Sequence, residues 1–174
     1  EQGAIVNKTQ LEKVKYYVDL AQKEGGKIAL GGSAPEAPNE RCREGYFFQP
    51  TVITGLSVSC RTNREEIFGP VLSVLRVNDF EEALQVANDT EFGLSSSIFT
   101  NDAARIFRFV DEIETGMTHI NSPTTGGEAH IPFGGTKGTG IGDREQGSTA
   151  LDFYTELKVV YVDYTGRKRE GNLY

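Results

Sequence analysis

Cysteine is scarce in this sequence of 174 residues, which contains two, Cys42 and Cys60. They do not form a CxxC pair, and no histidine stands at zinc-ligand spacing from them, so we expect no metal site. A chain with so few cysteines is typical of the reducing cytoplasm, where we expect this protein. Sequence alone gives no support for a disulfide between the two.

Basic residues are outnumbered, with 18 lysines and arginines against 25 aspartates and glutamates and a net charge of −7. This balance argues against nucleic acid or an anionic membrane as the main partner. No apolar stretch approaches the roughly 18 residues that a membrane-spanning helix needs. Residues 1–10 do not have the pattern of a signal peptide. The first residue is not methionine, so we expect the chain to begin within a longer protein.

Helical and extended patterns alternate along the chain, which is long enough for one domain with a core. This short alternation predicts an α/β fold, a parallel open sheet with flanking helices. The expected helices lie at residues 7–26, 79–90, 101–116 and 147–156, and the expected strands at 27–30, 46–55, 70–77, 94–100, 116–122 and 157–164.

Several of these elements carry more detailed expectations. Asn7 and Gln10 predict a capping box at the start of the first helix. Pro50 predicts an edge or irregular strand, and the apolar run 70–77 predicts a strand covered on both faces. Four residues of the helix 101–116 are expected to face inward at helical spacing: Ile106, Phe107, Val110 and Ile113.

Two glutamates and an isolated phenylalanine precede a Gly-Pro step in the stretch EEIFGP, residues 65–70. A carboxylate that accepts two hydrogen bonds is matched to a vicinal diol such as a ribose. A phenylalanine two residues later can lie against a flat heterocycle. Glu66 and Phe68 are therefore candidate ligand contacts, with Glu65 pointing away. The alternative is a pair of solvated glutamates at a helix end and a phenylalanine in the core.

The loop that follows the strand 116–122 is a second candidate, because ligands gather beyond the carboxyl ends of parallel strands. Asn121 stands at the strand end, and hydroxyl and backbone donors around Gly126 and Gly127 could hold a carboxylate. Phe133 offers an aromatic wall. The alternative is an ordinary irregular loop capped by its own serine and threonines.

No catalytic residue can be assigned from the residues alone. The glycine-rich stretch PFGGTKGTGIG is not a Walker A loop, because Lys137 is followed by Gly138, and it is not a dinucleotide fingerprint. His130 could serve as a general base, although a lone histidine more often has no such role. No Ser/His/Asp arrangement is visible, and neither cysteine sits in a segment typical of a nucleophile.

Several motifs together resemble the NAD(P)-dependent aldehyde dehydrogenases. They are EEIFGPVLSV, ANDTEFGLSSSIFT, GMTHIN, PFGGTKGTGIGDREQG and FYTELKVVYV, in the family's order and at similar spacing. The stretches EQGAIVNKTQLEKV and GYFFQPTVI are also similar, so the resemblance covers essentially the whole chain.

The resemblance implies a role for each candidate residue. In this family the glutamate of ExFGP binds the ribose hydroxyls on the nicotinamide side and the phenylalanine packs beside the nicotinamide. These roles pass to Glu66 and Phe68, and they imply NAD or NADP as the cofactor. The resemblance also places four residues near the substrate: Asn121, Gly126, Gly127 and Phe133.

The resemblance also implies that the chain is roughly the last third of an enzyme that oxidises an aldehyde to a carboxylate. The family's catalytic cysteine, general base, oxyanion-hole asparagine and dinucleotide-binding domain lie upstream of the matching segment. Neither Cys42 nor Cys60 inherits the nucleophile's role, so we expect no catalytic residue here and no activity from this chain alone. The alternative is a non-catalytic interaction or ligand-binding module of the same fold.

The expected substrate is a small aldehyde. The stretches NSPTTGGEAHIPFGGTKGTG and DREQGSTALDFYTE look most like family members that act on α-ketoglutarate semialdehyde, an acidic aldehyde. Residues 1–152 are expected to be the later part of the catalytic domain, and 153–174 an oligomerisation arm and tail. The strand around residues 156–163 is expected to pair with another subunit, giving a homodimer or homotetramer.

Overall fold

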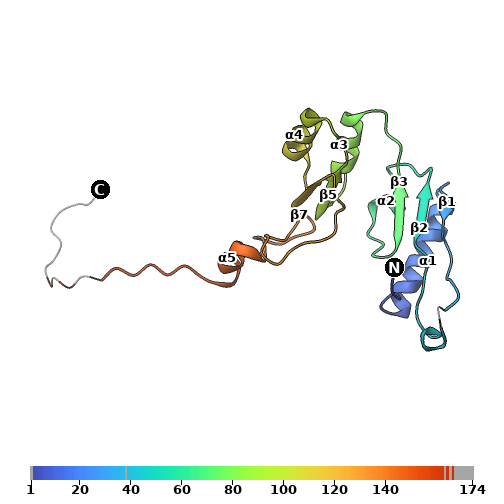
Figure 1. Cartoon of the computed structure of the whole chain (residues 1–174), viewed down its shortest axis with the longest axis horizontal. Coiled ribbons are helices and arrows are strands. Elements are labelled where there is room, and N and C mark those ends of the chain that lie inside the picture. The colour runs from blue at the N-terminus through green and yellow to red at the C-terminus, as the bar shows by residue number, and fades with distance from the viewer. Residues whose placement is uncertain (1, 38, 163, 165, 167–174) are drawn as a thin grey trace.

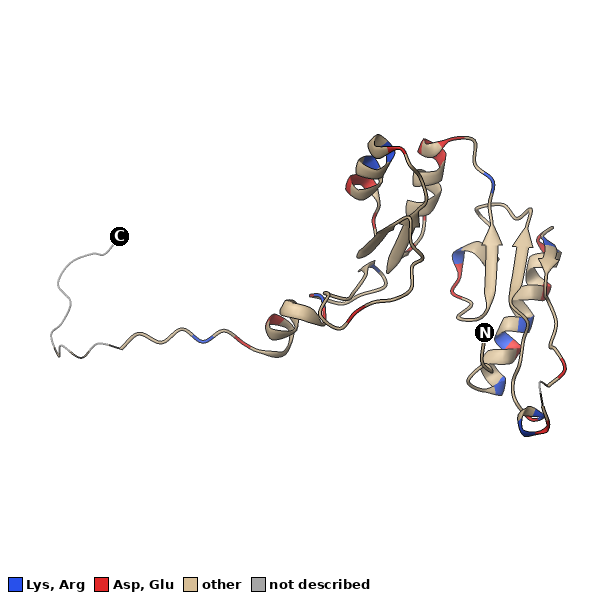
Figure 2. Cartoon of the chain, in the orientation of Figure 1, with Lys and Arg blue, Asp and Glu red and all other residues tan. Residues whose placement is uncertain are grey.

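The computed structural model describes residues 2–37, 39–162, 164 and 166. Its helices and strands form two groups along the chain, followed by an extended segment that leads away from both (Figure 1). Basic and acidic residues are interspersed along the helices of both groups (Figure 2). Among the described residues, no helix is both long and apolar enough to cross a bilayer.

The first group is a three-stranded sheet of order β1-β2-β3, with β1 antiparallel and β3 parallel to the central β2. Its elements are α1 (Lys8–Lys23), β1 (Lys27–Leu30), the 3-10 helix η1 (Glu40–Cys42), β2 (Thr51–Thr54), α2 (Arg61–Arg64) and β3 (Val71–Val74). The buried apolar side chains form two clusters between α1 and the sheet: Leu11, Val14, Val18 and Phe48 in one, and Ala21, Ile53 and Leu56 in the other.

The second group contains two helices and two small sheets. β5 and β6 pair in parallel, with α4 between them in sequence, and β4 pairs with β7 in antiparallel fashion. The elements are α3 (Phe80–Asn88), β4 (Phe92–Gly93), β5 (Ser95–Ile98), α4 (Ala103–Glu112), β6 (Met117–Ile120) and β7 (Thr136–Lys137). A cluster of Leu84, Phe109 and Ile113 forms the core of this group.

The predicted α/β fold class is confirmed, with parallel pairing between β2 and β3 and between β5 and β6. The described strands form three small sheets in place of one open sheet. Of the two alternatives predicted from Pro50, the edge position is wrong, because β2 is the central strand, whereas the pairing of β2 with β1 is irregular, with a register shift between Ile28 and Leu30. Pro50 lies just before the ladder begins and so removes no hydrogen bond from it, and the N–H of Thr51 donates to the carbonyl of Pro70 at 2.8 Å.

The prediction that residues 70–77 are covered on both faces is wrong for the described residues. Side chains alternate between the faces of a strand, and in β3 only alternate side chains are sheltered. Leu72 and Val74 are 60% and 44% exposed. The described residues therefore cover only one face of this apolar strand.

Two of the four inward positions predicted for α4 are also wrong. Ile113 is buried and Ile106 half-buried, but Phe107 and Val110 are 70% and 50% exposed, and Phe109 is buried in their place. Ile106, Phe109 and Ile113 share one side of a helix with 3.6 residues per turn. Because α4 covers a sheet of only two strands, it buries a narrower stripe than the sequence predicts.

The predicted helix 147–156 is present as η2 (Gly147–Thr149) and α5 (Ala150–Tyr154). The predicted strand 157–164 does not form within the described chain: residues 157–162 have no strand neighbour, and Leu157 and Tyr161 are 95% and 89% exposed. Strand structure needs a partner for its N–H and C=O groups, and no described residue supplies one. Asp163 lies outside the described residues.

The core position of Ile53 generates a stability prediction. Ile53 on β2 is fully buried, at 0% exposure, so Ile53→Ala should lower the free energy of unfolding by about 2–5 kcal/mol. Leu72→Ala on the neighbouring β3 is the matched control and should cost less than about 1 kcal/mol, since that side chain is largely exposed. Urea unfolding of this chain measures both, and equal losses would contradict the described packing.

Candidate functional site

The start of α1 is tied to the segment that carries Glu66 and Phe68. Asn7 caps the helix, since its Oδ1 accepts the N–H of Gln10 at 2.8 Å. The return bond of the predicted capping box is absent among the described residues. The Gln10 amide Nε2 instead donates to the carbonyl oxygens of Ile67 and Phe68, both at 2.8 Å. One side chain of α1 thus fixes two successive peptide units of the candidate cofactor segment.

Phe68 is held in an unusual conformation that turns its ring outward. Its φ is 55°, in the left-handed region, which is unfavourable by roughly 1–2 kcal/mol for a residue with a side chain. The next residue, Gly69, lies against α1 so closely that a Cβ there would stand 2.3 Å from Val14 Cγ2. The Phe68 ring is 75% exposed, so the alternative of a core phenylalanine does not hold in this structure.

The two glutamates of the segment have different surroundings. Glu65 accepts hydrogen bonds from Arg61 Nε and Nη2 at 2.6 and 2.9 Å and from the Tyr17 hydroxyl at 2.5 Å. Arg61 and then Tyr17 hold the pKa of Glu65 at about 2, below its ordinary 4.5. Glu66 is exposed and has no hydrogen bond or ion pair to any described residue. The Glu66 carboxylate is therefore available to a ligand, whereas the Glu65 carboxylate is already hydrogen-bonded to Arg61 and Tyr17.

An open hollow of about 400 Å³ lies beside Phe68. It is lined by residues of α2, of the segment 65–69 and of β3, including Phe68 and Glu65, while Glu66 is exposed outside this lining. Phe68 lines this hollow and is 75% exposed, which leaves its ring free to contact a planar group.

Asn121 plays a structural part in the second candidate loop. Its Oδ1 accepts the N–H of Thr100 at 2.8 Å and its Nδ2 donates to the carbonyl of the same residue at 3.0 Å. Its own N–H donates to the carbonyl of Ile98 at 2.8 Å, and its φ is 53°. The amide therefore joins the ends of β5 and β6, and in this structure both of its polar atoms are occupied.

Phe133 lines a second hollow, of about 350 Å³. Its backbone pairs with Glu145, with N–H to O distances of 2.6 and 2.9 Å in the two directions. Gly127 lies beside its ring, since a Cβ at Gly127 would stand 3.7 Å from the ring edge, and Gly126 has a φ of 98° that favours glycine. Gly127 and Phe133 thus come together, although Gly127 does not line the hollow, whose other lining includes the glycine-rich segment, Arg144 and Phe153.

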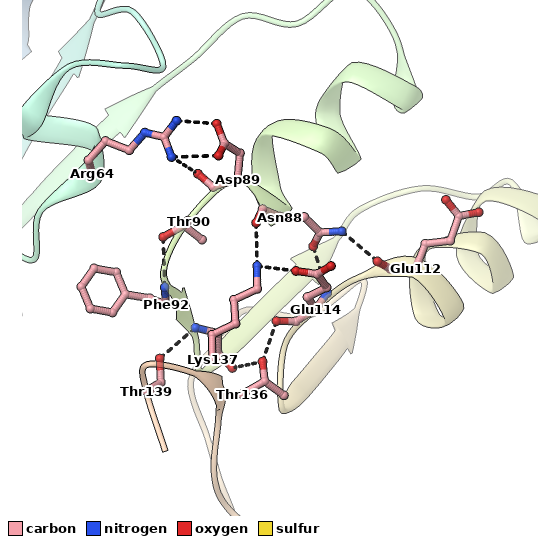
Figure 3. Close-up of polar contacts among 11 residues, drawn as sticks. Arg64, Asn88, Asp89, Thr90, Phe92, Glu112, Glu114, Thr136, Lys137 and Thr139 are labelled. Carbon is pink, nitrogen blue, oxygen red and sulfur yellow. Dashed lines mark hydrogen bonds and ion pairs between the residues drawn. The ribbon is translucent and has the colours of Figure 1, made fainter. Parts of the chain in front are cut away.

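A cluster of polar side chains gathers at the end of α3 (Figure 3). We call it the α3-end cluster: Arg64, Asn88, Asp89, Glu114 and Lys137. Arg64 donates to both carboxylate oxygens of Asp89 and, at 2.7 Å, to its carbonyl. Lys137 Nζ donates to the carbonyl of Asn88 at 2.6 Å and pairs with Glu114 Oε2 at 2.5 Å.

Sequence reasoning missed the α3-end cluster as a functional feature. Its members are spread from residue 64 to residue 137, so no local pattern marks them as neighbours. A usable signal was the stretch ANDTEFGL, which is part of the family resemblance and contains two members of the cluster, Asn88 and Asp89, at the end of α3.

The described residues contain no group of three or more histidines, cysteines or acidic residues placed to hold a metal ion. Cys42 and Cys60 are free thiols. His130 Nδ1 lies 3.3 Å from Glu128 Oε2, with both side chains largely exposed. These groups show no arrangement of a nucleophile with a base.

The surroundings of Glu65 generate a prediction about acid stability. A carboxyl whose pKa is lowered on folding stabilises the fold above its ordinary value of 4.5, and this contribution is lost as the pH falls toward about 2. Glu65→Gln cannot ionise, so the stability of this variant should change less with pH across that interval. Acid unfolding followed by circular dichroism measures the slope. Glu12→Gln, which removes an exposed pair with Lys15, should keep the wild-type slope, and a wild-type slope for Glu65→Gln would contradict the assignment.

Comparison with known proteins finds that this chain is similar to members of one family. The family model described as "Aldehyde dehydrogenase family" matches residues 1–160. The alpha-ketoglutarate semialdehyde dehydrogenase of Haloferax volcanii is 46% identical over 94% of this chain and 34% of its own length. The betaine aldehyde dehydrogenase of Brucella anthropi is 42% identical over 94% of this chain and 33% of its own length. The chain therefore spans about a third of the length of these curated relatives.

A solved structure gives the same result. The betaine aldehyde dehydrogenase of Staphylococcus aureus in complex with NAD+ superimposes with a TM-score of 0.81 and 37% sequence identity, covering 88% of this chain and 30% of that one. The resemblance inferred from the sequence motifs is confirmed.

Proposed function

This chain belongs to the aldehyde dehydrogenase family, and we propose that the protein containing it oxidises an aldehyde to a carboxylate with NAD+ as the hydride acceptor. The observation that carries the proposal is the family match over residues 1–160. NAD+ is favoured as the cofactor because the Staphylococcus aureus relative is solved in complex with it. NADP stays open, since this chain shows no residue that would read a 2′-phosphate.

The segment 65–69 is suited to one end of that cofactor. Glu66 offers a carboxylate that no described residue engages, and Phe68 offers an exposed ring two residues away. Glu66 would accept hydrogen bonds from the two hydroxyls of the nicotinamide ribose, which a charged acceptor strengthens. Phe68 would cover the nicotinamide, with its backbone held by Gln10. When bound, NAD+ takes up the hydride that leaves the substrate.

The loop of Phe133 would supply one wall of the aldehyde site. The Phe133 ring packs beside Gly127, and the left-handed Gly126 lets the chain turn there. Asn121 contributes by holding the ends of β5 and β6 together, since its amide is bonded to Thr100. In this proposal the groups that form and break bonds come from outside this chain, and Cys42 and Cys60 are not among them.

An acidic semialdehyde is the proposed substrate class. Two points support it: the Haloferax volcanii relative acts on alpha-ketoglutarate semialdehyde by its name, and the hydroxyls and N–H groups of the loop 121–133 can bind a carboxylate. A cationic aldehyde is the second candidate, because the Brucella anthropi relative is a betaine aldehyde dehydrogenase of similar identity.

The exposed segment 157–162 is the proposed contact with a second copy of the chain. Its apolar side chains are exposed, and its N–H and C=O groups have no strand neighbour among the described residues. A strand in this state can be added to the sheet of another subunit. The division into a catalytic part, residues 1–152, and an oligomerisation arm, residues 153–174, stays a prediction. A cytoplasmic location also stays a prediction, which the two free thiols favour.

The proposed function is tested by NADH formation in the full-length enzyme that contains this chain. We expect turnover with α-ketoglutarate semialdehyde and a kcat/KM at least about tenfold higher than with betaine aldehyde. This chain alone should form no NADH with either. A full-length enzyme inactive with both aldehydes would contradict the proposed reaction, and turnover by the chain alone would contradict the placement of the reacting groups outside it.

The role of Glu66 is tested by Glu66→Gln in the full-length enzyme. The change removes a charge-assisted hydrogen bond of about 1.5–3 kcal/mol, so the KM for NAD+ should rise roughly ten- to hundredfold. Glu12→Gln serves as the control, because Glu12 is an exposed glutamate on α1 paired only with Lys15 among the described residues. An unchanged KM for both NAD+ and NADP+ in Glu66→Gln would rule out the ribose contact.

A further inference from the structure

Helix α3 ends between two cations that come from different parts of the chain. Neither the carbonyl of its last residue, Asn88, nor that of the capping residue, Asp89, has a partner within the helix, although Asn88 accepts the N–H of Thr90 at 2.9 Å just beyond it. Lys137 Nζ donates to the first at 2.6 Å and Arg64 Nη1 donates to the second at 2.7 Å. The C-terminal end of a helix carries partial negative charge, so both cations are attracted to the same place.

Each cation is adjacent in sequence to one of the candidate loops. Arg64 is the last residue of α2, two positions before Glu66. Lys137 belongs to β7, four positions after Phe133. The end of α3 is therefore the place where the segment proposed to bind the cofactor and the loop proposed to face the aldehyde are fixed to a common support.

Both cations are held by more than their contact with the helix. Arg64 reaches both carboxylate oxygens of Asp89, a two-pronged geometry that fixes orientation as well as distance. Lys137 pairs with Glu114 at 2.5 Å, and its side chain is only 22% exposed. Lys137 also has a φ of 53°, which a residue with a side chain adopts reluctantly. Its contacts keep the chain in that conformation.

The support itself is rigidly connected to α4 and to the glycine-rich segment. The Asn88 amide donates to the carbonyl of Glu112 at 2.8 Å and accepts the N–H of Glu114 at 2.9 Å. Thr136 Oγ1 donates to the carbonyl of Glu114 at 2.7 Å. In Figure 3 these groups form a continuous network from the end of α3 to β7.

We propose that Arg64 and Lys137 are positioning residues that set the spacing between the loop of Glu66 and Phe68 and the loop of Phe133, by docking both loops on the C-terminal end of α3. The proposal rests on the proposed function of these loops. Because both loops share one support, loss of either cation disturbs the binding of both substrates. Neither residue needs to touch NAD+ or the aldehyde for this effect.

Steady-state kinetics of the full-length enzyme, with both substrates varied, test this coupling. Arg64→Met and Lys137→Met keep length and remove the charge. Each should raise the KM for NAD+ and the KM for the aldehyde, by roughly 2- to 30-fold. The double variant should lose less than the product of the two single effects, since the two residues act through one element. Lys137→Arg, which keeps the charge, should recover most of the loss.

Arg108→Met is the matched control. Arg108 of α4 joins that helix to α3 through Glu81 at 2.6 Å and also pairs with Glu112 of its own helix at 3.0 Å, but it has no contact with either loop among the described residues. Its loss should leave both KM values within about twofold of wild type. If Arg64→Met and Lys137→Met each change only the KM of the nearer substrate, or if Arg108→Met produces the same pattern, the proposal is wrong.

Hydrogen exchange separates this proposal from the proposed function, because it needs no turnover. The amides of Arg64 and Glu65 are bonded to the carbonyls of Cys60 and Arg61 at 3.2 and 2.9 Å. Lys137→Met in the full-length protein should speed their exchange, although the substitution lies on the other side of α3. Wild-type exchange at these amides would overturn the coupling even in an active enzyme. Faster exchange in an enzyme inactive with aldehydes would support the coupling and refute only the function.

Discussion

The C-terminal end of α3 leaves carbonyl oxygens that its own helix cannot satisfy, and the arrangement of the second half of the chain follows from how they are satisfied. Lys137 and Arg64 supply the donors from two different segments, and the Asn88 amide ties the end of α4 to the same point. β4 and β7 are only two residues each. Pairs of strands this short contribute little on their own, so the polar contacts at the helix end are needed to keep the glycine-rich segment in place.

Helix α1 plays the corresponding part for the first half of the chain. Its apolar side covers the three-stranded sheet, and its first turn reaches the candidate cofactor segment through Gln10. This support lets Phe68 keep a left-handed φ and an exposed ring, and it leaves Glu66 free while Glu65 is bound by Arg61 and Tyr17. A charged acceptor and an aromatic ring are therefore presented on a short segment whose backbone is fixed from behind.

Local physics made part of this structure predictable. The alternation of helices and strands, the cap at Asn7 and the short segment with Glu66 and Phe68 depend on residues close in sequence, and each was visible before the fold. The bond from Gln10 to Ile67 spans 57 positions, and Lys137 meets Asn88 across 49. Nothing local marks such pairs, and a lysine with positive φ is not expected where glycine is abundant.

The predictions of burial for β3 and α4 were wrong for another reason. Apolar residues indicate which side chains can be buried, but the described residues cover only some of them. The bonds between the Asn121 amide and Thr100 could not be predicted either, because they depend on how β5 and β6 end together.

We propose that the segment of Glu66 and Phe68 holds the nicotinamide end of NAD+ on a support shared with the loop of Phe133. A crystal structure of the full-length enzyme with NAD+ tests it most directly. We expect both oxygens of the Glu66 carboxylate within about 3.2 Å of the ribose hydroxyls, with Arg64 still bonded to Asp89 and Lys137 still bonded to Asn88. A ribose bound by other residues, or an α3 end released from either cation while NAD+ is in place, would contradict it.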